Sequence, residues 1–192
     1  NNDGGTSNTV FGKGAGLDLA SGGSFNTFFG EDSGANTTTS NENTAMGYRA
    51  LYYNVTGANN TAIGNVSMRG ASEQSSSNNT AVGHASLLVI TTGGSNTAVG
   101  AYAGDAINTG SSNSAFGKSA LTTNTNGIRN TAIGETSMQD NLNGSYNVAV
   151  GRESLFRNVT GGQNTAVGHS ALSGANAQSH SNNTAVGYSA LG

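Results

Sequence analysis

The feature that most constrains this chain is a five-residue motif that recurs along its whole length. The motif is Asn-Thr-Ala-Val-Gly or a close variant, and it occurs eleven times in 192 residues. Its Asn stands at positions 8, 26, 43, 60, 79, 96, 113, 130, 147, 164 and 183. Seven of the ten intervals are 17 residues, one is 18 and two are 19. A nearly fixed period of this length is typical of a repeat architecture in which each copy stacks on the next.

The columns of the motif indicate a short strand between two corners. Asn and Gly are invariant, the fourth position is always apolar, nine copies have Thr at the second position and nine have Ala at the third. Thr and Val suit a pleated strand, whereas Gly tolerates positive φ and Asn tolerates turns. Stacked Asn side chains can also hydrogen-bond one another as an amide ladder. We predict structural corners at Asn60, Gly64, Asn96, Gly100, Asn130, Gly134, Asn164 and Gly168.

The fold class that follows is all-β, a parallel β-solenoid of about eleven 17-residue rungs. Alternation places Thr and Val on one face of the strand and Ala on the other. We expect the Val/Ile/Phe column to face the interior and the Ala column to face outward. A second short strand is expected at the Ala/Ser-Leu positions that follow each corner Gly. Helices are disfavoured because no 3.6-residue apolar period is sustained and 30 Gly would weaken helix interiors.

A longer period lies over the first one. The Asn residues at 26, 43, 60 and 79 reappear 104 positions later at 130, 147, 164 and 183. The lengthened Ser-rich loops at 69–78 and 173–182 fall in the same register. We therefore interpret residues 1–192 as one repetitive domain, a six-rung unit written almost twice. We also expect it to be a fragment of a longer fibre, since neither end carries an evident polar cap.

Composition narrows the function classes. Hydrophobic residues make up 34% and charged residues 9%, so only a thin core is expected. The net charge of −3 without a basic patch argues against nucleic-acid binding. No apolar run is long enough to span a bilayer, so we expect no membrane insertion in this segment. Disorder is the alternative for so polar a chain, but the strict columns argue against it.

The motif resembles repeats of known trimeric fibres. Asn-Thr-Ala-Val-Gly-x-x-Ala-Leu is similar to the Asn-Ser-Val-Ala-Ile-Gly-x-x-Ser repeat in the head domains of YadA-type trimeric autotransporter adhesins. It is even more similar to the Asn-Thr-Ala-Ile-Gly-Tyr-x-Ala-Leu arrays of bacteriophage tail fibres. The resemblance covers essentially the whole chain, although the rung here is longer than in the adhesin head. It implies a left-handed β-roll that forms a side-by-side homotrimer, with surface loops that meet the host.

The expected outward Ala column adds an argument for the homotrimer. A continuous stripe of small apolar side chains on a surface usually marks an interface, and the partner available to a repetitive chain is another copy of itself. A monomeric solenoid with an Ala-rich surface is the alternative. We predict that the subunit contact includes Ala62, Ala81, Ala98, Ala132, Ala149, Ala166 and Ala185.

Residues that could carry chemistry are few. A zinc site needs three or four converging ligands, and the chain has three scattered His and no Cys. We therefore predict no catalytic residue, metal or other cofactor, and no enzyme. Tyr52, Tyr53 and Phe156 begin the loops between rungs, where exposed aromatic rings could bind a host glycan or protein receptor. The alternative is that these three rings cover the rung edge or pack between protomers.

Two functions from different classes remain. The first is a structural or adhesive shaft of an extracellular, cell-surface or virion fibre, such as a phage tail fibre or a bacterial adhesin filament. The second is ice binding, because antifreeze solenoids also repeat Thr and carry few charges. The single Thr column shares its strand face with Val and Ile, so we expect it to point inward or lie at a rung edge. That expectation favours the shaft.

Overall fold

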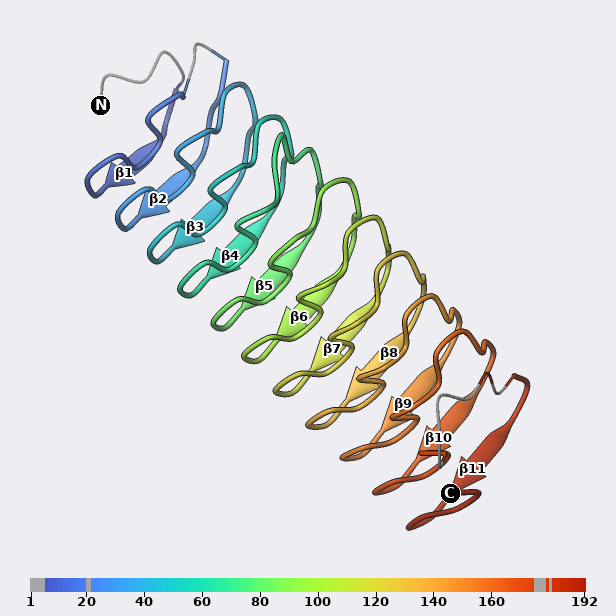
Figure 1. Cartoon of the computed structure of the whole chain (residues 1–192). Coiled ribbons are helices and arrows are strands. Elements are labelled where there is room, and N and C mark those ends of the chain that lie inside the picture. The colour runs from blue at the N-terminus through green and yellow to red at the C-terminus, as the bar shows by residue number, and fades with distance from the viewer. Residues whose placement is uncertain (1–5, 20–21, 175–178, 180) are drawn as a thin grey trace.

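The computed structural model describes residues 6–19, 22–174, 179 and 181–192. The predicted fold class is confirmed, because these residues form a β-solenoid with no helix. Eleven parallel strands make one sheet whose spatial order is the chain order, β1 to β11. Figure 1 shows the strands stacked one above another, with β1 and β11 at opposite ends of the rod.

Each strand is the Thr-Ala-Val segment of one motif. The strands are β1 (Thr9–Phe11), β2 (Thr27–Phe29), β3 (Thr44–Met46), β4 (Thr61–Ile63), β5 (Thr80–Val82), β6 (Thr97–Val99), β7 (Ser114–Phe116), β8 (Thr131–Ile133), β9 (Val148–Val150), β10 (Thr165–Val167) and β11 (Thr184–Val186). Equivalent positions pair across neighbouring strands, as Ala62 does with Ala81. The two extra residues of that 19-residue interval lie in the loop, where Asn54 and Gln74 form a parallel bridge. The sheet therefore stays in register.

The interior is filled from two walls of unequal side-chain size. The Ala of each motif from Ala45 to Ala185 is buried, and in seven rungs the Leu or Met four residues after the corner Gly, such as Leu121 and Met138, packs in the same core cluster. The walls are close, because the Ser67 hydroxyl of the return wall donates to the Ala81 carbonyl of the sheet at 3.1 Å. Only a small side chain fits on the sheet at this distance. The expectation that Val, Ile and Phe fill the interior is therefore wrong.

The first two rungs reverse the sizes and support the same geometry. Their strands carry Val10 and Phe28 in place of Ala, and Phe28 is fully buried. The return wall carries Gly16 and Gly34 where most other rungs have Leu or Met. A Cβ built on Gly34 would lie 2.6 Å from the Phe28 ring, so the glycine makes room for the phenyl group. The two walls thus exchange volume within a rung, as close packing requires.

The return wall is not a strand, so the predicted second strand is absent from the described rungs. Residues two and four positions after each corner Gly have positive φ, for example 51° at Arg49 and 55° at Leu51. The alternation turns successive N–H groups in opposite directions. Arg49 N–H donates to Glu31 in the preceding rung and Leu51 N–H donates to Ser67 in the following rung, each at 3.0 Å. Hydrogen bonds on both sides stabilise a conformation that L-residues rarely adopt.

The corner glycines are required by backbone geometry and by space. Gly64, Gly100 and Gly134 have φ of +132°, +135° and +132°. A Cβ on any of the three would lie 2.5 Å from the carbonyl oxygen of the corner Gly in the next rung. A side chain would therefore strain the backbone and separate the two rungs.

The Asn column forms the expected amide ladder inside the rod. Each side-chain amide donates to Oδ1 of the Asn in the preceding rung, at 2.9–3.2 Å. The same Oδ1 accepts the backbone N–H of that neighbouring Asn at 2.8–3.1 Å. The amide also donates to a carbonyl of the following loop, as Asn96 does to Gly110 at 2.9 Å. These bonds satisfy buried polar groups that would otherwise be costly.

Candidate functional site

The outer face of the sheet is the most regular surface of the molecule. Since the middle residue of each strand points inward, its first residue (Thr in nine strands) and its apolar third residue point outward on every rung. The outer face therefore consists of two columns that run the length of the rod. The expectation that Thr points inward or lies at a rung edge is wrong, because Thr61 and Thr97 are only half-buried on this face.

The apolar column of the outer face is unusually exposed. Seven of its members have between 37% and 69% of their surface accessible: Phe11, Phe29, Met46, Ile63, Phe116, Ile133 and Val186. The first two rings stack on each other, with centroids 5.0 Å apart and an interplanar angle of 15°. At a strand spacing of roughly 4.8 Å, eleven rungs extend this stripe over about 50 Å. Long exposed apolar stripes usually mark an interface.

The predicted Ala contact residues lie on the other side of the same strands. Their exposed surface is zero or close to it, so their side chains cannot touch a neighbouring chain without unfolding of the rung. This corrects the prediction for Ala62, Ala81, Ala98, Ala132, Ala149, Ala166 and Ala185. The small size of these residues is explained by the return wall of their own chain. On these strands, the side chains that another molecule could touch are those of the outer face, which includes the apolar column.

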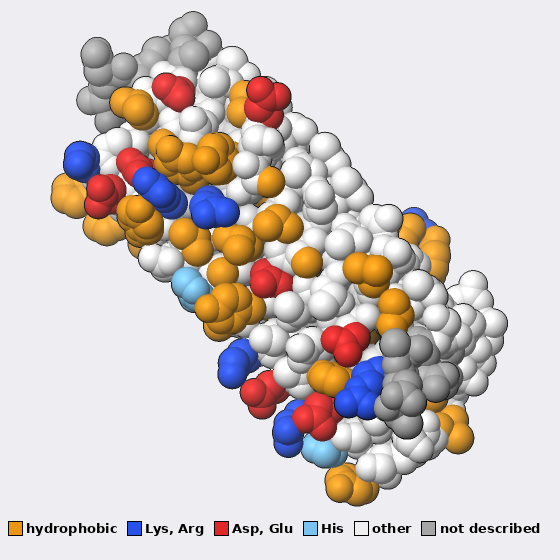
Figure 2. Space-filling model, viewed as in Figure 1, with side chains coloured by type: hydrophobic (Ala, Val, Ile, Leu, Met, Phe, Trp, Pro, Cys, Tyr) orange, Lys and Arg blue, Asp and Glu red, His pale blue; other side chains and the backbone are white. Residues whose placement is uncertain are grey.

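One edge of the rod carries charged and aromatic side chains that pair between rungs. Lys13 lies 4.0 Å from Glu31, and Glu135 lies 3.9 Å from both Lys118 and Arg152. Figure 2 shows Lys, Arg, Asp, Glu and His side chains gathered along this edge. Exposed pairs of this kind add little stability. Because these three pairs join equivalent positions of adjacent rungs, they favour the observed register.

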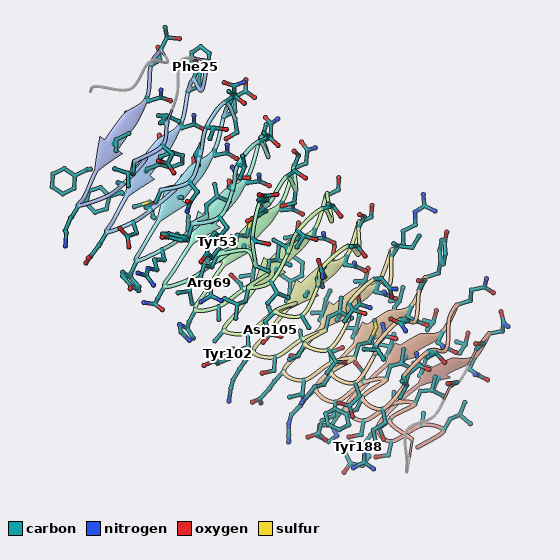
Figure 3. The ribbon with its side chains drawn as sticks, turned by 45° about the horizontal axis from the view of Figure 1, so that its top comes forward. Phe25, Tyr53, Arg69, Tyr102, Asp105 and Tyr188 are labelled. Atoms are coloured by element: carbon teal, nitrogen blue, oxygen red, sulfur yellow. The ribbon has the colours of Figure 1, made fainter. Side chains whose placement is uncertain are left out.

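The predicted aromatic site at Tyr52 and Tyr53 is occupied by neighbours from the same chain. The two rings contact edge to face with centroids 4.6 Å apart. The Arg49 guanidinium lies 5.2 Å from the Tyr52 ring centroid and donates to Asp32 at 3.2 Å. This hydrogen bond raises the pKa of Arg49, and Tyr53 lies beside Arg69 in the next rung (Figure 3). The arrangement clips successive rungs together and leaves little ring surface for a ligand.

Phe156 occupies the equivalent place 104 residues later and lines a shallow depression. The depression has a volume of about 290 Å³, and Glu153, Arg157, Ser173 and Gly174 complete its lining. Phe156 is half-buried, and the Arg157 guanidinium lies 5.7 Å from its ring centroid. The repeat thus places a cation beside an aromatic ring at both positions, without bringing Phe156 near Tyr52 or Tyr53.

Asp105 is the carboxylate whose environment departs most from water. Burial raises its pKa above the ordinary value of 3.8, and one of its oxygens is buried without a hydrogen-bond partner. No group of three or more His, Cys, Asp or Glu that could hold a metal ion occurs among the described residues. A single half-buried carboxylate offers neither a proton-transfer partner nor a ligand set.

Comparison of the chain with protein-family models, with curated proteins and with solved structures finds no match. The described residues contain no helix of the length and hydrophobicity needed to cross a bilayer. The outer face of the sheet, with its two exposed columns, is therefore the feature on which a functional assignment can be built.

Proposed function

We propose that this chain builds the shaft of an extracellular or virion fibre, in which copies associate side by side through the outer face of the sheet. The observation that carries the proposal is the apolar column described above, seven of whose members are left exposed by the described residues. A surface of this length that is apolar on every rung is costly to leave in water.

A second copy of the chain is the partner that fits this face best. The apolar side chains recur at the rise of the solenoid itself, about 4.8 Å per rung. A copy aligned along the same axis presents the same rise, so contacts made at one rung are repeated at the others. In a closed symmetric assembly, every copy also buries its apolar face against another copy. The number three, the left-handed coil and the attachment role come from the resemblance to trimeric fibres.

The proposed role is structural and adhesive rather than catalytic. The invariant positions serve the backbone: Gly at the corner, Asn in the ladder and Ala against the return wall. The positions that vary point to solvent, at the edges and in the loops. A fibre uses such a division because the constant part builds length and the variable part meets other surfaces. An extracellular or virion location suits this role.

The mass of the purified chain in solution tests the proposal. Light scattering is expected to give three times the chain mass of 19.1 kDa. Cross-linking through a Cys introduced at Ile133 is expected to join equivalent positions of two copies. A mass of 19.1 kDa across the micromolar range would overturn the proposed assembly.

Ice binding is the second candidate, and the outward Thr column favours it. Figure 1 shows the regular array of parallel strands that carries this Thr column, and a regular array of hydroxyl groups is the kind of surface that an ice lattice can match. The large and uneven side chains Phe11, Phe29 and Phe116 on this face argue against a flat ice plane. Thermal hysteresis of the purified protein distinguishes the two candidates. A value equal to that of buffer would exclude ice binding. A clear difference between the melting and freezing temperatures that Thr97→Leu abolishes would support it.

A further inference from the structure

The loops between strands carry a groove on the surface of the rod, and this groove takes no part in the proposed side-by-side association. It crosses the loops of rungs 8 to 10, which lead to β9, β10 and β11, and has a volume of about 470 Å³. Its lining includes Asn143, Ser145, Tyr146, Gln163 and Asn182. The volume falls within the range of about 300–1,000 Å³ found for small-molecule sites. None of the eight lining residues is Asp, Glu, Lys, Arg or His.

Three of these lining residues occupy equivalent positions in successive rungs and share one backbone conformation. Tyr146, Gln163 and Asn182 each precede a ladder Asn, and their φ angles are 62°, 61° and 60°. The N–H of each donates to the preceding rung, from Tyr146 to Ile128 at 3.0 Å and from Gln163 to Ser145 at 3.1 Å. The side chains are therefore presented on a rigid backbone at rung spacing, about 4.8 Å.

Tyr146 is fixed as the aromatic wall of the groove. Its hydroxyl accepts a hydrogen bond from Arg129 Nη1 at 2.9 Å, and the guanidinium lies 5.4 Å from the ring centroid. Arg129 comes from the rung before Tyr146, whereas the rest of the groove lies over the rungs after it. The cation and the groove are thus on opposite sides of the ring. A preorganised ring loses little conformational entropy when a ligand stacks on it.

The polar groups beside the ring are ready to bind hydroxyl groups. The side-chain amides of Gln163 and Asn182 are exposed and make no hydrogen bond to another described residue. Each amide offers both a donor and an acceptor, as vicinal hydroxyls of a sugar require. The Ser181 hydroxyl, in contrast, is engaged by the Gly162 N–H at 3.1 Å.

We propose that this groove binds a neutral saccharide, with one sugar ring stacked on Tyr146 and its hydroxyls hydrogen-bonded to Gln163 and Asn182. An acidic sugar would need a cation in the groove, and none of the eight lining residues carries a positive charge. A peptide would need an apolar pocket or an open strand edge, and the groove has neither. The inference deepens the proposed attachment role and rests on it, although one chain builds the whole groove.

A printed array of neutral and sialylated oligosaccharides, probed with the full chain, tests the proposal. Binding to neutral oligosaccharides is expected, with at least a tenfold loss in Tyr146→Ala and in Gln163→Ala. Tyr146→Phe keeps the ring and should keep most of the binding. Tyr102→Ala is the matched control, because Tyr102 is 42% exposed and Tyr146 is 47% exposed. Circular dichroism of each variant verifies the fold.

Three outcomes would overturn the proposal: no binding to any oligosaccharide, binding only to sialylated ones, or binding that survives Tyr146→Ala. Light scattering on the same samples separates this inference from the proposed assembly. A chain that binds neutral sugars as a monomer would refute the trimeric shaft and keep the groove. A trimer that binds no sugar would do the reverse.

Discussion

The two walls of the solenoid both fill the interior, but with side chains of different size and with different backbone conformations. The sheet wall contributes Ala to the interior and places its large apolar residues outside, whereas the return wall contributes Leu and Met to the interior. The sheet wall uses ordinary strand geometry, and the return wall alternates positive and negative φ. The comparison shows that the core of each rung is complete without the apolar column. That column is therefore available for contacts with another molecule.

The sharpest way to break this comparison is to exchange the sizes of the two walls in one rung. Phe28→Ala removes a fully buried ring and is expected to cost about 3–5 kcal/mol of unfolding free energy. Gly34→Leu alone should also destabilise, because its side chain would meet the Phe28 ring. The double variant recreates the Ala-Leu pair of rung 3 and should recover most of the loss.

Chemical denaturation of the two single variants and the double variant measures this cycle. A strongly favourable coupling energy is the expected result. Strictly additive losses would mean that the two walls do not share the volume of the rung.

A change at a corner tests what both walls depend on. Gly100→Val forces a β-branched residue to adopt a φ of +135° and places its Cβ 2.5 Å from the Gly117 oxygen. We expect a loss of about 3 kcal/mol and a clear fall in melting temperature. His84→Ala, at an exposed position next to a corner, is the control and should melt like the parent. Equal melting of the two variants would contradict the assigned role of the corner.

Asp105 offers a smaller test, on the solvent side of the return wall. Burial raises its pKa, so the folded state disfavours the charged carboxylate and loses stability as the pH rises above about 3.8. Asp105→Asn is therefore expected to stabilise the protein at pH 7, by less than about 1 kcal/mol. The gain should vanish below pH 3.8, where the carboxyl is protonated in both states.

Denaturation of Asp105→Asn and the parent at pH 7 and pH 3 provides the measurement. Glu135→Gln, on the exposed charged edge, is the control for removal of one negative charge. A gain that is the same at both pH values would show that burial of the charge is not its cause.

The sequence predicted the backbone of the sheet correctly, but the wrong face of each strand was assigned to the interior. Its period predicted the eleven strands, their register, the glycine corners and the Asn ladder, because each depends on a residue with a distinctive backbone or side-chain property. Alternation separates Ala62 from Thr61 and Ile63 but does not say which face is inside. The Gly34–Phe28 pair held that information, since a large residue on one wall coincides with glycine on the other.

The return wall could not have been predicted from residue preferences. Val66 and Thr136 adopt φ of 49° and 54°, although β-branched residues disfavour positive φ. Hydrogen bonds to the rungs on either side stabilise this conformation, and such long-range support has no local signature. The groove at Tyr146 was not predicted from the sequence for a similar reason, because its residues are 17 or 19 positions apart and belong to a variable column.

The central claim is that the apolar column of the sheet is a self-association surface, and matched charge insertions test it most directly. Phe116 and Leu142 are each 39% exposed, but only Phe116 lies on the outer face of the sheet. Light scattering on Phe116→Glu, Leu142→Glu and the parent compares the two sites at equal exposure. The account predicts that the parent and Leu142→Glu are trimers and that Phe116→Glu dissociates into folded monomers. Equal trimer masses for all three proteins, or a monomeric parent, would contradict it.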